Sequence, residues 1–142
     1  MRLRLVMLGK TRRPELRAVL DDYVKRVGRA CPIEVNEVRD GEAALKRLDA
    51  DRAATALLLD AGGKPQDSGS LARWLGEQRD RGTREIVFLC GDADGFPEAV
   101  RRRVAQRISL SPMTFSHELA RVMLAEQLYR AFAILSGSPY PK

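Results

Sequence analysis

Short apolar segments that alternate with helix-like patterns constrain the fold of this chain more than any other feature. Ala56–Leu59 and Ile86–Cys90 are continuous apolar runs, which are typical of strands buried on both faces of a sheet. Each run is followed by a polar or glycine-containing segment, as expected where a strand ends. The other predicted strands lie at Leu3–Leu8, around Ile33, Val35 and Val38, and around Ile108 and Leu110.

Helical periodicity fills the intervals between these strands. Apolar residues recur at three- and four-residue spacing, and proline and glycine stand where helices begin and end. The predicted helices run from Pro14 to Gly28, over Glu42–Ala54, from Ser68 or Ser70 to Gly82, from Pro97 over a few residues, and from about Ser116 to Leu135.

Alternating strands and helices favour an α/β fold, in which a parallel sheet is flanked by helices. A length of 142 residues fits a single domain, residues 1–142. Ligands of such sheets bind in the crevice beyond the carboxyl ends of the strands. We therefore expect the functional loops after Leu59, Cys90 and Leu110.

The two later loops differ in chemistry. Residues 90–96, CGDADGF, lack the three-glycine spacing of a dinucleotide fingerprint and the lysine of a P-loop. Asp92 and Asp94 would repel a pyrophosphate, so this loop is either a binding loop for an uncharged or cationic group or simply an acidic turn. Residues 111–116, SPMTFS, suit a flat ring such as adenine, although Met113 and Phe115 are equally typical of a core.

Several site classes are disfavoured by the residues present. His117 is the single histidine, and Cys31 and Cys90 are the two cysteines, so neither a metal site nor a disulfide framework is expected. A nucleophile elbow is missing, which argues against a hydrolase triad. With no secretory signal and no apolar stretch as long as a membrane span, we expect a cytoplasmic protein without a membrane partner.

Positive charge is concentrated at the amino end. The chain has 25 Lys and Arg against 19 Asp and Glu, a net charge of +6. Residues 1–30 contain nine basic and three acidic side chains and so hold the whole excess. This asymmetry indicates either an anionic partner such as nucleic acid or an arginine-rich solvated surface.

The last predicted helix is apolar around much of its circumference. Leu119, Val122, Met123, Leu128 and Phe132 exceed what one buried stripe needs. Such a helix either lies at the centre of the core or meets a second subunit.

The carboxyl-terminal third has long, specific motifs. IVFLCGDADGF (86–96) and SLSPMTFSHELARVMLAEQLYRAFAILSGSPY (109–140) resemble the bacterial ribosomal RNA large-subunit pseudouridine N3-methyltransferases, which are SPOUT, or α/β-knot, methyltransferases. LLLDAGGKPQDSGSLARWL (57–75) is similar to the third-strand region of the same family. The resemblance implies a trefoil knot in the carboxyl half, a homodimer, and S-adenosyl-L-methionine as cofactor.

The resemblance also implies site residues and a substrate. The family's cofactor contacts fall on Leu59, Gly91, Ser111, Pro112, Met113, Thr114, Phe115 and Ser116. The implied substrate is N3 of a pseudouridine in 23S ribosomal RNA within the assembled ribosome. N3 is a weak acid, so a base or a cation that favours the imide anion should assist. Arg130, Tyr140 and Lys142 are the expected catalytic residues, and a salt bridge to Glu126 is the alternative role for Arg130.

Two positions depart from the family's pattern. The family's tail histidine is Pro141 here, and its first glycine after the fourth strand is Cys90. Proline removes an imidazole and a backbone donor, and a cysteine side chain occupies space where the family has only hydrogen. The alternatives to an active enzyme of this class are therefore a catalytically impaired homologue that binds ribosomes or RNA, and a SPOUT methyltransferase with another RNA target.

Overall fold

The computed structural model describes residues 1–50 and 54–140 and contains one parallel five-stranded sheet with the strand order β2-β1-β4-β3-β5. The strands are β1 (Arg2–Leu8), β2 (Ile33–Val38), β3 (Thr55–Pro65), β4 (Glu85–Cys90) and β5 (Arg107–Ser109). The helices are α1 (Pro14–Gly28), α2 (Gly41–Ala50), α3 (Ser68–Asp80), α4 (Glu98–Arg103) and α5 (His117–Ser136). The predicted α/β class is confirmed, whereas the trefoil knot stays a prediction.

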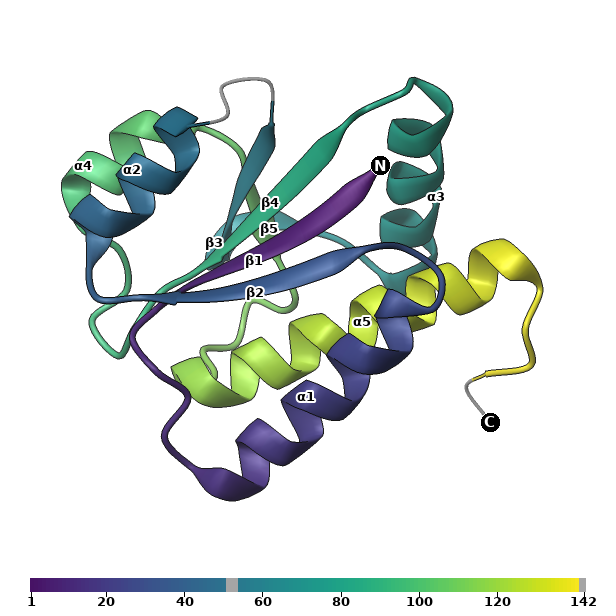
Figure 1. Ribbon diagram of the computed structural model, residues 1–142, viewed down its shortest axis with the longest axis horizontal. Coiled ribbons are helices and arrows are strands. Elements are labelled where there is room, and N and C mark those ends of the chain that lie inside the picture. Colours follow the sequence, from purple (N-terminus) through teal and green to yellow (C-terminus); the bar gives the residue numbers. More distant parts are fainter. Residues whose placement is uncertain (51–53, 141–142) are drawn as a thin grey trace.

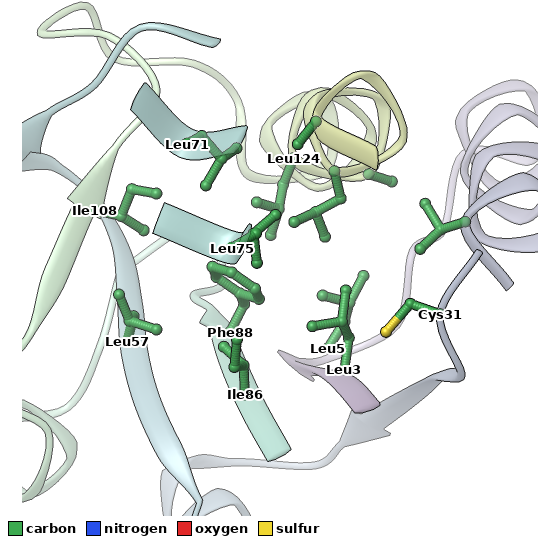
Figure 2. Close-up of a cluster of buried hydrophobic side chains, with 14 of the residues drawn as sticks. Leu3, Leu5, Cys31, Leu57, Leu71, Leu75, Ile86, Phe88, Ile108 and Leu124 are labelled. Carbon is green, nitrogen blue, oxygen red and sulfur yellow. The ribbon is translucent and has the colours of Figure 1, made fainter. Parts of the chain in front are cut away.

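Helices cover both faces of the sheet. α1, α3 and α5 lie on one face, and α2 and α4 lie on the other (Figure 1). Side chains of β1 alternate between the two layers, because successive residues of a strand point to opposite faces. Leu3 and Leu5 join the cluster under α1, α3 and α5 (Figure 2), while Val6 and Leu8 join the cluster under α2 and α4. This alternation explains why the strands read as continuous apolar runs.

The third strand is longer than predicted. The glycine-containing segment after Leu59, expected where a strand ends, is part of β3, which shifts register between Leu59 and Lys64 and then pairs with β5 again. A Cβ atom on Gly63 would lie 2.9 Å from the Cβ of Arg107, so this close approach of two strands requires glycine. The glycines therefore mark an irregular strand edge, which sequence patterning does not distinguish from a turn.

Two helices differ from their predicted bounds, and a third begins as predicted. Asp67, not Ser68 or Ser70, caps α3, because its carboxylate accepts a hydrogen bond of 2.7 Å from the amide of Ser70. α2 covers Gly41–Ala50 instead of Glu42–Ala54; residues 51–53 lie outside the described part of the chain. Ser116 caps α5 by accepting from the amide of Leu119, in agreement with the predicted start.

Two charged residues in the first turns of α5 hold the loop between β1 and α1. The Glu118 carboxylate accepts hydrogen bonds from the backbone amides of Arg12 and Arg13, at 3.1 and 3.0 Å. These bonds, chiefly the one from Arg13, lower the pKa of Glu118. The carboxylate also lies at the amino end of α1, where negative charge is favourable.

Arg121 makes the deeper contact with the same loop. Its side chain is fully buried, and its guanidinium donates to the carbonyl oxygens of Leu8 and Gly9 and to the hydroxyl of Thr11, at 2.6, 3.1 and 3.0 Å. A buried cation is stabilised only when acceptors replace its hydration. Arg121 therefore ties the carboxyl-terminal helix to the end of the first strand.

We expect Arg121→Met to lower the free energy of unfolding by about 3 kcal/mol, because it leaves the carbonyl oxygens of Leu8 and Gly9 buried without this donor. Urea denaturation at neutral pH measures the change. Arg79→Met, at an exposed position of α3, is the control and should change stability by less than about 0.5 kcal/mol. Equal stability of the two variants would show that Arg121 does not anchor α5.

Candidate functional site

The three segments expected to bind a ligand, those after Leu59, Cys90 and Leu110, meet around one cavity, which we call the strand-end cavity. The cavity has a volume of about 420 Å³, which lies in the range of small-molecule sites. Its walls come from the middle of β3 where the register shifts, from the end of β4 and the loop after it, from the loop after β5, from α4, and from the first turn of α5. Of the residues predicted from sequence to bind the cofactor, those that line it are Leu59, Gly91, Ser111, Met113, Thr114, Phe115 and Ser116. Pro112 belongs to the same loop, outside the lining.

The loop that follows β5 is ordered by short-range hydrogen bonds. The buried hydroxyl of Ser109 is 3.1 Å from the carbonyl oxygen of Ala61 and 2.8 Å from that of Ser111, and its single proton can serve one of them at a time. The Ser111 hydroxyl accepts from the amide of Met113 at 3.0 Å. Met113 is 72% exposed, so its side chain stands at the cavity mouth and is not part of the core. The alternative assignment of Met113 to the core is therefore wrong.

Gly91 permits a close approach of two backbone segments beside the cavity. A Cβ atom at this position would lie 2.8 Å from the carbonyl oxygen of Gly95, closer than real side chains approach. The glycine thus lets the loop fold back through its bridge between Asp92 and Gly95. A side chain at Gly91 would push this loop open.

Cys90 forms part of the cavity floor without being reactive. Its side chain is buried in the core cluster beneath α5. Burial raises the pKa of the Cys90 thiol to about 12, so the group stays protonated at neutral pH. Cys90 therefore acts as a small apolar residue at the position where the family resemblance implies glycine.

Sequence reasoning missed two charged residues of this site. Asp60 follows the buried part of β3, and Arg101 lies on α4; both line the cavity and are joined by a hydrogen bond of 2.8 Å. The position of Asp60 directly after an apolar strand was a usable signal. The position of Arg101 gave no such signal, because it depends on how α4 packs over the sheet edge.

The predicted catalytic residues gather at a different place. The Glu126 carboxylate accepts hydrogen bonds from Arg130 Nε at 3.1 Å and from the Tyr140 hydroxyl at 2.8 Å. The Arg130 guanidinium also lies 5.3 Å from the centre of the Tyr140 ring. The alternative role of Arg130, an ion pair with Glu126, is thus present in the structure. Lys142 and Pro141 lie outside the described residues.

Tyr140 is held by aromatic packing as well. Its ring centre is 4.6 Å from that of Tyr129. Burial, followed by hydrogen bonds with Tyr23 and Glu126, raises the pKa of Tyr140. The hydroxyl therefore remains protonated at neutral pH and is a hydrogen-bond donor, not a base.

A second cavity, of about 540 Å³, lies beside the carboxylate that holds Arg130 and Tyr140. Glu126 and Tyr23 line it, together with Val19 of α1 and Met123 of α5. Val19 and Met123 are 42% and 37% exposed. Glu126, the shared partner of Arg130 and Tyr140, thus faces a cavity other than the one formed by the strand-end loops.

Within residues 1–50 and 54–140, the structure contains no cluster of three His, Cys, Asp or Glu side chains with metal-binding geometry. In the same part of the chain, no helix is long and apolar enough to span a membrane. His117 is the first residue of α5 and lies 3.8 Å from the Glu118 carboxylate, at the cavity wall.

Comparisons with known proteins identify the family. A family model described as predicted SPOUT methyltransferase matches residues 1–141. Ribosomal RNA large subunit methyltransferase H of Pelobacter propionicus is 45% identical over 151 residues, covering 99% of each chain. The protein of the same name from Solibacter usitatus is 41% identical over 143 residues, again covering 99% of each chain.

Solved structures share the fold at low sequence identity. The tRNA (m1G37) methyltransferase of Aquifex aeolicus aligns with a TM-score of 0.64 and 17% identity, covering 100% of this chain and 75% of its own. The SpoU methyltransferase AviRb of Streptomyces viridochromogenes, solved with AdoMet, aligns with a TM-score of 0.57 and 13% identity, covering 96% of this chain and 58% of its own. Since the family model and the relatives match along almost the whole sequence, this chain belongs to the SPOUT methyltransferases and, among them, to the family of the ribosomal RNA large subunit methyltransferase H proteins.

Proposed function

We propose that this protein uses S-adenosyl-L-methionine to methylate N3 of a pseudouridine in 23S ribosomal RNA of the large subunit, in the cytoplasm and on the assembled ribosome. The observation that carries the proposal is the meeting of the three strand-end loops around one cavity, in a chain that is 45% identical to a protein named ribosomal RNA large subunit methyltransferase H. The substrate position and the ribosomal context follow from the family resemblance.

The cavity suits the cofactor in both shape and chemistry. Leu59, Leu110 and Phe115 offer apolar surface to an adenine ring, and the Ser111–Ser116 loop would bind the ring edge through backbone groups. Asp92 would offset the positive charge of a sulfonium. S-adenosyl-L-methionine, when bound, supplies an electrophilic methyl group.

The protein's own contribution is orientation and charge. N3 lies on the pairing edge of the base, so the pseudouridine must be unpaired or turned outward to reach the cavity. The Arg130 guanidinium would favour the imide anion at N3, and the Tyr140 hydroxyl would donate a hydrogen bond to the base. Lys142 is proposed as a second cation.

A second copy of the chain would join the two halves of this site. Arg130 and Tyr140 meet at Glu126, away from the cavity that the strand-end loops line in the same chain. Val19 of α1 and Met123 of α5 expose apolar side chains next to Glu126. We therefore infer a homodimer in which the α1 and α5 faces pair, so that Tyr140 of one copy approaches the cavity of the other.

We expect Met123→Asp to convert the protein from a dimer to a monomer, because it places a charge in the proposed apolar contact. Sedimentation velocity at micromolar concentration measures the mass. Ala99→Asp, at an exposed position of α4 on the opposite face of the sheet, should leave the dimer intact. An unchanged mass of Met123→Asp, or a monomeric starting protein, would contradict the proposed interface.

The amino-terminal charge excess is only partly available to an anionic partner. Arg17 pairs with Glu37, and Arg26 pairs with Asp22. Five exposed cations of this region form no ion pair within the described part of the chain, and we define them as the docking surface: Lys10, Arg12, Arg13, Lys25 and Arg29. We propose that this docking surface binds ribosomal phosphates, which would supply affinity without sequence specificity.

The triple variant Arg12→Gln, Arg13→Gln, Lys25→Gln should bind ribosomes more weakly and with a shallower dependence of affinity on salt, because fewer counterions are released. Filter binding at several potassium concentrations measures this slope. The affinity for S-adenosylhomocysteine should stay unchanged, since none of the three residues lines the strand-end cavity.

A matched triple variant controls for loss of charge alone. Arg79→Gln, Arg81→Gln, Arg84→Gln removes three exposed cations near the end of α3 and should keep the original salt slope. If both triple variants lose ribosome affinity equally, the docking surface is not a specific one.

Deletion of the gene should remove the methylated pseudouridine from large-subunit RNA, which nucleoside mass spectrometry measures directly. Re-expression of the protein should restore the signal. An unchanged signal in the deletion strain would refute the proposed substrate.

The impaired homologue is distinguished by the same assay. A protein that binds S-adenosylhomocysteine but restores no methylation would be an RNA-binding relative that has lost catalysis. In that case Pro141→His should restore the methylated nucleoside, because it returns the imidazole that the family has at this position.

A further inference from the structure

Arg101 occupies an unusual place in the strand-end cavity. Besides the protonated Cys90 thiol, the charged and titratable side chains that line the cavity are Asp60, Asp92, Arg101 and His117. Arg101 projects from α4 and is the permanently charged cation of this set. Neither the adenine ring, which is neutral, nor the sulfonium, which is positively charged, needs a cation as its partner.

The Asp60 carboxylate is shared between two guanidinium groups, those of Arg101 and Arg107. One carboxylate oxygen, Oδ1, accepts from the amide of Gly62 at 3.1 Å, and the other, Oδ2, lies 2.8 Å from Arg101 Nη1 and 3.5 Å from Arg107 Nη1. The hydrogen bond from Arg101 is the largest cause of the lowered pKa of Asp60. Two guanidinium groups thus share one carboxylate, so Asp60 occupies only part of the hydrogen-bonding capacity of Arg101, the arginine of the pair that lines the cavity.

The guanidinium of Arg101 is held by two contacts and keeps N–H groups that can bind a ligand. Its central carbon lies 5.8 Å from the centre of the Phe96 ring, and its Nη2 lies beside Gly95. A guanidinium has five N–H donors, of which Nη1 directs one to Asp60. Among the described residues the other donors have no hydrogen-bond acceptor, and the side chain is 38% exposed toward solvent. The residue is thus held by Asp60 and Phe96 while offering a fork to a ligand.

We propose that Arg101, held by Asp60, binds the carboxylate at the amino-acid end of S-adenosyl-L-methionine. This inference rests on the proposed function, because it assumes that the strand-end cavity holds this cofactor. The carboxylate is the single anionic group of the molecule, so it is the group that matches the remaining N–H donors of Arg101. Adenosine and the sulfonium would then occupy the remainder of the cavity, toward Leu110 and Asp92.

A pair of ligands that differ only at the amino-acid end tests this assignment. S-adenosylhomocysteine carries the carboxylate, whereas 5′-methylthioadenosine keeps the adenosine thioether and lacks the amino-acid end. In Arg101→Met, we expect the affinity for S-adenosylhomocysteine to fall about tenfold, because a charge-assisted bidentate contact is lost. The affinity for 5′-methylthioadenosine should change by less than about twofold. Isothermal titration calorimetry on the full-length protein measures both.

Two variants keep the comparison specific. Arg102→Met removes the neighbouring arginine of α4, whose side chain is 77% exposed and paired with Glu98, and should alter neither affinity. Arg101→Lys keeps the charge without the fork and should retain part of the preference for S-adenosylhomocysteine. Thermal unfolding of all three variants establishes that they are folded.

Three results would overturn the assignment. Equal losses for both ligands in Arg101→Met would mean that the residue shapes the cavity and does not bind the carboxylate. Unchanged affinity for both would mean that Arg101 does not contact the ligand, and weaker ribosome binding with that result would assign Arg101 to RNA phosphates. Failure of the unaltered protein to bind either ligand is a separate outcome, because it refutes the proposed cofactor itself.

Discussion

The contact between the first turns of α5 and the loop after β1 is the interaction on which the rest of the structure depends. The Glu118 carboxylate accepts hydrogen bonds from two backbone amides of this loop. The buried Arg121 donates hydrogen bonds to the carbonyl oxygens of Leu8 and Gly9, where the loop begins. Both residues belong to the helix whose first residues, His117 and Ala120, also form a wall of the strand-end cavity. The first turns of α5 therefore connect the carboxyl-terminal helix to the loop after β1 and also shape the candidate site.

The charged groups divide the molecule into regions with different chemistry. The strand-end cavity has a cationic wall at Arg101 and an acidic loop at Asp92, an arrangement that complements a ligand with charges of both signs. Arg130 and Tyr140 meet on the carboxyl half of α5 around Glu126. The exposed amino-terminal cations of the docking surface line neither of the two cavities. In the proposed dimer these regions would supply cofactor binding, charge stabilisation and RNA docking, respectively.

Much of the fold was predictable because both of its layers obey simple periodicities. The continuous apolar run of β4 reflects burial under helices on either face, and the cap of α5 at Ser116 was read correctly. The cap of α3 and the extent of β3 were not, since Ser, Asp and Gly occur in turns, caps and irregular strands alike. At the site, the loops after Cys90 and Leu110 followed from their positions at strand ends, whereas the segment after Leu59 lies within β3. Arg101 was not predictable, because α4 reaches the cavity only through its packing against the sheet.

The sequence by itself determined the fold class, the family and the three loops expected to form a site. These features depend on local spacing and on long motifs that are written along the chain. Tertiary structure decided which charged groups remain free to bind a ligand or a partner. Glu37 pairs with Arg17, two guanidinium groups share the Asp60 carboxylate, and Glu126 accepts hydrogen bonds from both Arg130 and Tyr140. The partners of Glu37 and Asp60 are distant in sequence, so only the folded chain brings them within hydrogen-bond distance. Glu126 meets Arg130 because they are one helical turn apart, and it meets Tyr140 because the segment after α5 folds back. The +6 net charge is thus a property of the sequence, whereas its distribution among ion pairs and free surface depends on the packing of the helices against the sheet.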